Sequence, residues 1–546
     1  MKKIFLSIFM IFALLFAGCV DLTEHPMSVL TPGGYYTSKQ GIETLVYSIY
    51  SKMRFLGGGT HFYRLTQMGT DVCQAGLSSH PNLEDNYQMA PTDGPCTSFW
   101  TDAYTVINAC NYVTDYLPQV EDMTDAEKKG REAEARFFRA WMYYHLTMQF
   151  GDVHYSTEAT LDVETEANRT PVNTIWDESI YPDLEFAVAN LPAKQADYGR
   201  IDQWSAKFFL AYVLLSDIRA TSTHFSRAAQ LTTDIINNSH YELQPTRALV
   251  FDENNEHNSE IMWSIQFPQD ELYLQGGNYS HLIYVTSYQE CPGMTRVVQY
   301  GRSYIQFKPV PAYFDLYDET IDSRYEAWWL DTWLCTLPGT YTIKSGDVTR
   351  TVTYEYMVDT TIVMPKRAWS KEYIDSKPYR VFNPELEPNY GANYYNQDLR
   401  YYPTLKKFMD GKRTTANEAR GNREWVVFRL AEAYLLAGEA YFRMGQADEA
   451  AKWINVIRRN AAYPGKEDAM TITAADLSID FILDERSREL FGEDNRWEDL
   501  KRLGKLPERA LLNPNVTEWK DYYMLRPIPQ SHIDRCTNDY PQNPGW

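Results

Sequence analysis

Apolar residues recur every three or four positions in several segments of the chain, which places them on one face of an α-helix. In the first segment, which starts near Ser38, Ile42, Leu45 and Ile49 form such a face. The segments with this spacing are 38–55, 99–117, 124–150, 203–237, 425–459 and 480–500. The pattern predicts a mainly α-helical protein.

Three of these segments, 124–150, 203–237 and 425–459, have the character of helical hairpins. In the third, Gly438 and Ala450 supply small side chains, Tyr441 an aromatic one and Gly445 the turn, as in a tetratricopeptide unit. Small residues let two helices approach closely, and the aromatic ring fills the gap beside them. The spacing between segments is too irregular for a contiguous array. We therefore predict tetratricopeptide-like helix pairs that form a scaffold with long insertions.

The stretch from about 261 to 410 differs from the rest of the chain. It is rich in Tyr, Trp, Gly and Pro and has little helical periodicity. Residues 340–364 alternate around Ser345-Gly346-Asp347, which predicts a small β-hairpin. Because irregular segments of this length are usually functional, we predict a ligand-binding insertion here. It would belong to a single domain, 35–546, with a C-terminal region at about 411–546.

The N-terminus has the pattern of a lipoprotein signal peptide. Lys2 and Lys3 precede a short apolar run from Ile4 to Phe16, and the small residues before Cys19 resemble a bacterial lipobox. The apolar run is shorter than the roughly 20 residues that a membrane-spanning helix needs. We expect residues 1–18 to be removed and Cys19 to be acylated, leaving residues 19–34 as a lipidated tether.

The charge of the chain argues against nucleic acid as a partner. The formal net charge is −21, and loss of residues 1–18 removes Lys2 and Lys3 and no acidic residue, which gives −23. Such a chain does not seek phosphate backbones or anionic lipid electrostatically, so we expect the acyl group to be its only membrane anchor. The six cysteines after Cys19 form no C-x-x-C pair, which leaves a metal site without support and disulfide bonds open.

Five sequence elements follow one another along the chain. They are the lipobox with Asp21-Leu22 and Pro26; Gly69-Thr70-Asp71 with Trp100, Tyr104, Ile107 and Asn111; Arg429–Leu435 with Gly438-Glu439-Ala440, Asn455 and Arg458; Ile482–Arg486 with Glu489-Leu490, Gly492-Glu493, Arg496-Trp497 and Asp499-Leu500; and Pro527-Ile528-Pro529 with Asn543-Pro544-Gly545. In this order they resemble the SusD/RagB family of outer-membrane nutrient-binding lipoproteins. The resemblance implies a SusD-like α/α superhelix on the cell surface. It also implies that the protein holds oligosaccharide, or in some members peptide, for a SusC-like TonB-dependent transporter, without catalysis or cofactor.

The ligand chemistry must come from the residues themselves, because the family varies most in the middle region. A sugar presents apolar C–H faces and a hydroxyl rim, so aromatic rings flanked by carboxylates, amides and Arg suit it. The binding candidates are Asp71, Tyr284, Tyr288, Arg296 and Trp329. Trp100 and Trp497, in periodic helical stretches, are expected to pack rather than bind. The charges of Glu485, Arg486 and Glu489 are expected to pair with each other or with helix ends.

Three other functions stay open from the sequence. A secreted glycoside hydrolase needs two opposed carboxylates, and with 73 acidic residues no particular pair stands out. The chain has no G-x-S-x-G, H-E-x-x-H or P-loop motif, and its ten His are scattered singly. A peptide- or glycopeptide-binding protein would show a groove with unpaired backbone amides and a hydrophobic pocket. A purely structural surface protein would show no aromatic platform.

Overall fold

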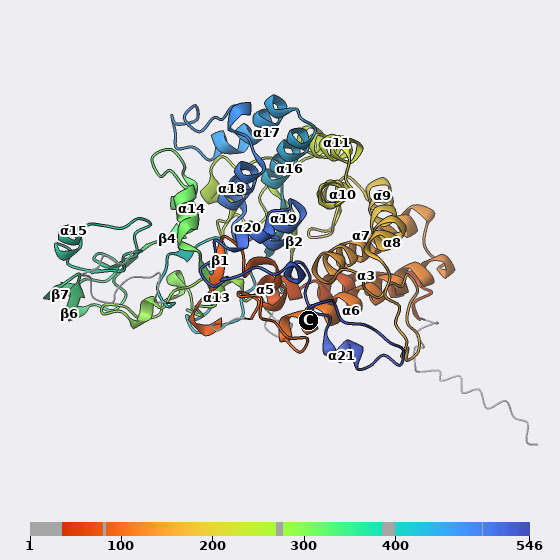
Figure 1. Cartoon of the computed structure of the whole chain (residues 1–546), viewed down its shortest axis with the longest axis horizontal. Coiled ribbons are helices and arrows are strands. Elements are labelled where there is room, and N and C mark those ends of the chain that lie inside the picture. The colour runs from red at the N-terminus through yellow and green to blue at the C-terminus, as the bar shows by residue number, and fades with distance from the viewer. Residues whose placement is uncertain (1–34, 80–82, 269–276, 385–398, 494) are drawn as a thin grey trace, which may run out of the picture.

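The computed structural model of the chain describes residues 35–546 except 80–82, 269–276, 385–398 and 494 (Figure 1). The predicted signal peptide, Cys19 and the tether therefore lie outside the described residues. The described part is mostly helical, with a few small sheets, which confirms the predicted fold class. No helix within it is both long and apolar enough to cross a bilayer.

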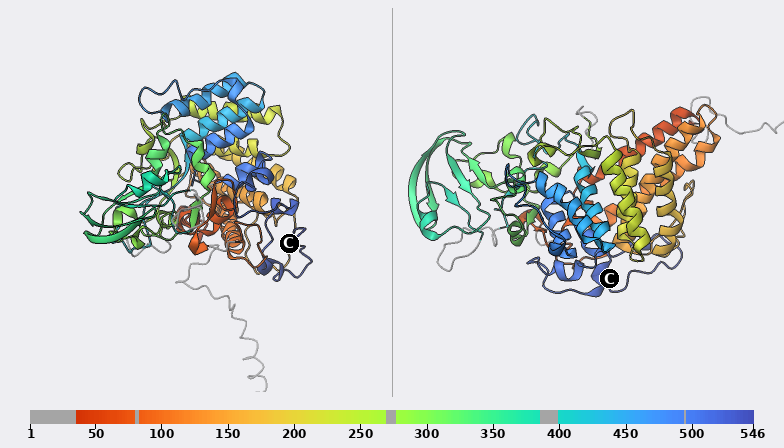
Figure 2. Two further views of the ribbon diagram at one scale, coloured as in Figure 1. Left: turned by 60° about the vertical axis from the view of Figure 1, so that its left-hand side comes forward. Right: turned by 90° about the horizontal axis from the view of Figure 1, so that it is seen from above.

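The scaffold is a row of helices in which each packs on the next. Along this row α3 packs on α6, α6 on α7, α7 on α9, α9 on α10, α10 on α11, α11 on α16 and α16 on α17 (Figure 2). The bounds are α3 Lys39–Lys52, α6 Gly94–Tyr116, α7 Asp125–Phe150, α9 Tyr181–Asn190, α10 Gln203–Ser216, α11 Ser222–Asn238, α16 Leu430–Arg443 and α17 Ala447–Asn460. Shorter helices in the first half are α4 Phe55–Gly58, α5 His61–Gln67, α8 Val172–Ile175 and α12 Arg247–Val250.

Two of the three predicted hairpins form. α10 pairs with α11, and α16 with α17, although residues Trp425–Arg429 before α16 are a strand, β11. A Cβ on Gly438 would lie 2.5 Å from Cγ1 of Ile454, so only glycine permits this helix approach. The hairpin predicted for residues 124–150 does not form. Segment 124–150 is one continuous helix, α7, which starts with a capping box between Thr124 and Glu127 and pairs with α6.

The middle region holds most of the strands. The predicted hairpin is confirmed as β6, Gly339–Ser345, and β7, Val348–Tyr354, paired from Gly339↔Tyr354 to Ser345↔Val348. It projects at one end of the molecule (Figure 1). The other strands are β1 Cys73–Ala75, β2 Ile261–Ile265, β3 Phe307–Pro309, β4 Trp329–Leu330, β5 Thr332–Leu334, β8 Thr360–Val363, β9 Arg380–Val381 and β10 Thr404–Leu405. The helices here are α13 Ser280–Ile283, α14 Arg324–Trp328 and α15 Lys371–Asp375.

The C-terminal region contains two helices where a single one, 480–500, was predicted. α18, Ile479–Leu490, ends just before Gly492, whose φ of +83° no helical residue adopts, and α19 spans Arg496–Arg502. The chain then passes through α20, Leu506–Ala510, and α21, Gln530–Ile533. α21 lies beside the chain terminus below the helix row (Figure 1).

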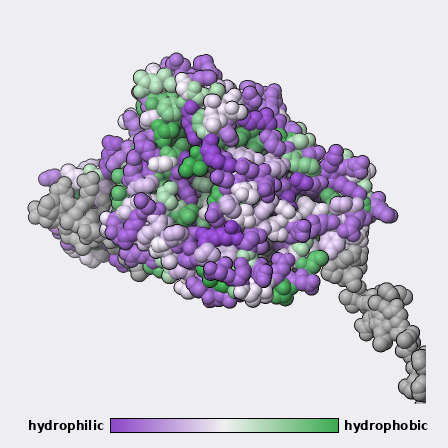
Figure 3. Space-filling view, turned by 45° about the vertical axis from the view of Figure 1, so that its right-hand side comes forward, coloured by the Kyte–Doolittle hydropathy of each residue, from purple (hydrophilic) through white to green (hydrophobic). Residues whose placement is uncertain are grey.

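One large hydrophobic core extends from α3 to the C-terminal segment, and a separate cluster around Tyr288, Trp333 and Tyr402 fills the middle region. The six cysteines after Cys19 are all described, and none forms a disulfide. The face in Figure 3 is mainly hydrophilic with separate hydrophobic patches, as expected for an acidic surface.

Candidate functional site

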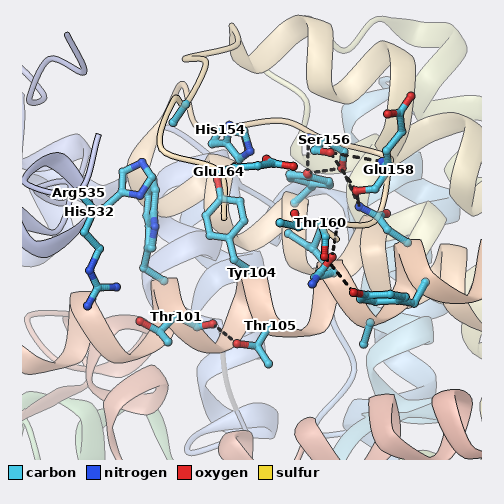
Figure 4. A pocket seen from close by; sticks show the side chains of 18 of the residues that line it. Thr101, Tyr104, Thr105, His154, Ser156, Glu158, Thr160, Glu164, His532 and Arg535 are labelled. Atoms are coloured by element: carbon cyan, nitrogen blue, oxygen red, sulfur yellow. Dashed lines mark hydrogen bonds between the residues drawn. The ribbon is translucent and has the colours of Figure 1, made fainter. Parts of the chain in front are cut away.

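A cavity of about 630 Å³ lies between α6, the segment from His154 to Ala167 and the C-terminal residues Ser531–Cys536 (Figure 4). Its volume is in the range of sites for small ligands. Segments that are far apart along the chain therefore form its walls, and α3 adds Lys52 to the lining.

The floor of the cavity is one face of α6. Thr101, Thr105, Asn108 and Tyr112 follow each other at helical spacing and line the cavity. Phe99, on the opposite face, is buried in the core. The amphipathic character of α6 thus orients a polar and aromatic stripe toward the cavity.

The opposite wall is a loop that α6 and α7 hold by its backbone. The Tyr104 hydroxyl donates to the His154 carbonyl at 2.7 Å, and the Tyr112 hydroxyl donates to the Thr160 carbonyl at 2.9 Å. The Asn111 amide donates to the Glu158 carbonyl at 2.9 Å. Because these bonds use main-chain carbonyls, the side chains of the loop remain available to the cavity.

Aromatic rings line the end of the cavity near α21. The Trp100 ring centre lies 5.1 Å from that of Tyr104 and 4.9 Å from that of His532. Tyr104 in turn lies 5.8 Å from His154. Trp100 is buried, as predicted, but its position at the cavity edge makes it part of this wall.

The two histidines of the cavity are neutral at pH 7. Burial lowers the pKa of His154, although the nearby Glu164 opposes this. Burial is the main cause that lowers the pKa of His532 to about 4, and the charge of Arg535 acts in the same direction. The buried Nδ1 of His154 has no hydrogen-bond partner among the described residues. A neutral imidazole offers one donor and one acceptor, which suits hydroxyl groups.

Four of the five predicted binding residues lie in the packed interior. Both oxygens of Asp71 accept bonds from Arg496, at 2.8 and 2.6 Å. Tyr284 and Trp329 both pack against Phe491, with ring centres 5.5 and 5.0 Å away. The Tyr288 hydroxyl donates to the Gly301 carbonyl at 2.7 Å, and its side chain is fully buried.

This burial argues against these four as glycan contacts in the described arrangement. Their residue types fit sugar chemistry, but aromatic rings in an irregular region also build a satellite core, and that is where Tyr288 lies. Arg296 is half-buried, and its Nη1 donates to Asn417 Oδ1 at 2.8 Å. Its role in binding stays a prediction, as does the acylation of Cys19.

Glu485 and Glu489 of α18 are buried and paired, as a structural role requires. Their partners in the described part of the chain include arginines of other elements and not, as had been predicted, each other or Arg486. Arg429 donates to Glu260 at 2.9 Å and to Glu489 at 2.7 Å. Glu489 also accepts from Arg247 and Arg324, each at 3.1 Å. Burial works against ionisation of Glu489, but the three guanidinium charges outweigh it and lower its pKa to about 2. We call Arg247, Glu260, Arg324, Arg429, Glu485 and Glu489 the buried ion network; all six are buried.

Sequence reasoning missed the cavity. Trp100, Tyr104 and Asn111 belonged to the recognised pattern, but nothing connected them to Glu158 or Arg535. The signal available was the polar stripe of α6, in which Thr101, Thr105, Asn108 and Tyr112 share one face.

Comparison with known proteins covers nearly the whole chain. The family profile described as "SusD family" matches residues 259–546, and the one described as "Starch-binding associating with outer membrane" matches residues 38–215. "SusD-like protein P2" of Formosa agariphila is 27% identical over the full length of both chains. "Starch-binding protein SusD" of Bacteroides thetaiotaomicron is 24% identical, over 90% of this chain and 86% of that one.

Solved structures show the same fold. A "laminarin binding SusD-like protein" superposes with a TM-score of 0.68 at 22% identity, covering 93% of this chain and 100% of that one. "Surface glycan-binding protein A" of Bacteroides thetaiotaomicron in complex with laminarihexaose gives a TM-score of 0.69 at 20% identity, covering 93% of this chain and 99% of that one. From its profile match over more than half its length, the chain belongs to the SusD family.

Proposed function

We propose that this protein is a lipid-anchored protein of the outer-membrane surface that binds an oligosaccharide and passes it to a partner TonB-dependent transporter. The observation that carries the proposal is membership of the SusD family, together with the second profile over residues 38–215. The names of a relative and of two structural neighbours include starch, laminarin and laminarihexaose, so a glycan is the ligand that they favour.

The cavity supplies chemistry that suits a sugar. Tyr104 and His532 line it with rings for C–H faces. Glu158 and Glu164 provide acceptors for hydroxyl groups, and Arg535 provides donors. Confinement at a membrane raises the effective concentration of the ligand at the transporter, so moderate affinity would be enough for capture. Moderate affinity would also allow the ligand to dissociate toward the transporter.

The first experiment is calorimetric titration of the protein without residues 1–19 against a panel of polysaccharides and a peptide digest. We expect saturable binding to at least one glycan without any release of reducing ends. Release of reducing ends would indicate a glycoside hydrolase instead. Saturable binding of peptide alone would replace the glycan by the peptide alternative.

Two variants of one residue test the cavity as the binding site. Tyr104→Ala removes the ring and should weaken glycan binding about tenfold, a loss of ~1.4 kcal/mol. Tyr104→Phe keeps the ring and loses only the hydrogen bond to the His154 carbonyl, so it should bind nearly as well. Equal affinity of Tyr104→Ala and the parent protein would place the glycan elsewhere.

The anchor is tested separately. Cys19→Ala should move the protein from the outer-membrane fraction to the soluble fraction in cells that lack the transporter, because acylation would be its only attachment. Retention of Cys19→Ala in that membrane fraction would contradict the lipid anchor and leave glycan binding untouched.

A further inference from the structure

The charges around the cavity are unevenly distributed. Glu158, Glu164 and Glu166 line it from the loop, whereas the lining cations are Arg535 and Lys52. Figure 4 labels Glu158, Glu164 and Arg535. Lys52 lies close enough to Asp102 of α6 to affect its ionisation, so part of its charge is already offset. The two histidines add no charge at pH 7, because the pKa of each is lowered. The cavity therefore presents more negative than positive charge to a ligand.

The three loop carboxylates differ from most acidic groups of the fold because they are unpaired. Within the described residues, no ion pair or hydrogen bond uses the side chain of Glu158, Glu164 or Glu166, and all three are exposed. The contact that Glu158 makes to Asn111 is through its main-chain carbonyl. Three exposed carboxylates with free acceptor oxygens thus stand on the loop that lines the cavity.

A neutral sugar fits this arrangement and an anionic one does not. Each hydroxyl can donate to a carboxylate, which is the stronger kind of hydrogen bond because one partner is ionised. A uronate or sulfate group would instead lie among carboxylates, with Arg535 as the main compensating charge. The net charge of the whole chain, −21, opposes the approach of a polyanion as well.

We propose that this cavity selects neutral oligosaccharides and excludes chains that carry carboxylate or sulfate groups on successive sugars. The proposal rests on the proposed function, which assigns a glycan to the protein without saying which kind. The loop carboxylates act as hydroxyl acceptors for the neutral chain and as repulsive groups against the anionic one.

The test compares matched glycans that differ in charge. Laminarin, dextran and galactomannan are titrated beside their sulfated forms, with polygalacturonate and alginate as naturally acidic chains, at low salt. We expect at least one neutral glycan to bind, and its sulfated form to bind at least about tenfold more weakly. Tighter binding of any acidic glycan than of every neutral one would overturn the proposal and leave glycan binding itself standing.

Sulfation also removes hydroxyl donors, so a variant must separate charge from lost hydrogen bonds. The combined variant Glu158→Gln, Glu164→Gln, Glu166→Gln keeps acceptor oxygens and removes the charges, and it should fold because the three side chains are exposed and unpaired. In the parent protein, the affinity for the neutral glycan divided by that for its sulfated form is the selectivity ratio. We expect this ratio to fall at least about fivefold in the variant. An unchanged ratio of the affinities for neutral and sulfated glycan would overturn the proposal.

Glu355→Gln is a control for the loss of one surface charge away from the cavity. Glu355 is exposed and directly follows β7, which lies at the left-hand end of the molecule in Figure 1, away from α21. The variant changes the net charge by one without altering the cavity. The ratio of its affinities for neutral and sulfated glycan should therefore equal that of the parent protein. If no glycan of either charge binds the parent protein, the proposed function fails, and this inference fails with it.

Discussion

The buried ion network and the cavity use the same residue types in opposite ways. In the network, Glu489 accepts hydrogen bonds from three arginines and is inaccessible to solvent. In the cavity, Glu158 and Glu164 have no side-chain partner among the described residues and are exposed. Burying a charge is costly unless it is paired, so a buried carboxylate stabilises the fold only with its partners present. A free carboxylate at a cavity wall costs little and is available to a ligand.

The largest effect should follow removal of the central acid of the network. Glu489→Ala leaves Arg247, Arg324 and Arg429 with uncompensated charge in the interior, and should lower the free energy of unfolding by about 3–5 kcal/mol. Denaturant unfolding followed by circular dichroism measures the change. Glu449→Gln breaks an exposed pair with Lys452 in α17 and serves as control, with an expected change below ~1 kcal/mol. Equal stability of the two variants would contradict the role assigned to the network.

The extent to which these two regions could be predicted differs for a physical reason. The helices could be predicted because their signals are local in sequence. The apolar face of α16 and the small residue Gly438, for example, both belong to one hairpin. The cavity depends on contacts such as that between Tyr112 and the carbonyl of Thr160, which lies 48 residues further along the chain. Glu158 and Glu489 have the same chemistry in the sequence, and only tertiary packing decides which one is paired.

The aromatic candidates were chosen by a criterion that core residues satisfy equally well. Tyr284 and Trp329 were selected for their residue type in an irregular region, but irregular backbone also has to bury side chains. Both pack on Phe491, which lies in the turn between α18 and α19. The break at Gly492 that creates this turn was not visible in the helical periodicity of 480–500.

The next effect concerns Asp71, a predicted ligand residue whose carboxylate forms a buried ion pair with Arg496. Asp71→Ala should cost about 3 kcal/mol of unfolding free energy, because Arg496 and Arg509 lose a shared partner. Glycan affinity of the folded protein should be unchanged, as measured by calorimetry well below the unfolding temperature. A selective loss of affinity with normal stability would restore Asp71 as a ligand residue.

Acid should lower the stability of the fold through the network, whereas the exposed carboxylates of the cavity should add nothing to that loss. The pKa of Glu489 is about 2 in the folded protein, compared with an ordinary value of 4.5, so below pH 4.5 the unfolded chain binds a proton that the folded one does not. The stabilisation is complete above pH 4.5 and is lost as pH falls toward 2, by about 2 kcal/mol at pH 3. Unfolding temperatures measured from pH 7 to pH 3 should therefore fall. The triple glutamine variant of the cavity should show the same decline, because its changed carboxylates make no ion pair among the described residues; a flatter profile for it would contradict the distinction.

The smallest effect on stability is expected for Arg296→Ala, which directly compares the two places where a glycan has been predicted. Arg296 is half-buried and bonds to one amide oxygen, so its loss should cost less than ~1 kcal/mol of unfolding free energy. If the cavity is the binding site, Arg296→Ala leaves the affinity within about twofold, whereas Arg535→Ala lowers it about tenfold through loss of a charged hydrogen-bond donor. Calorimetry on both variants decides between them. The reverse result, a loss with Arg296→Ala and none with Arg535→Ala, would move the glycan to the middle region, where side-chain chemistry alone had placed it, and would leave the cavity without a ligand.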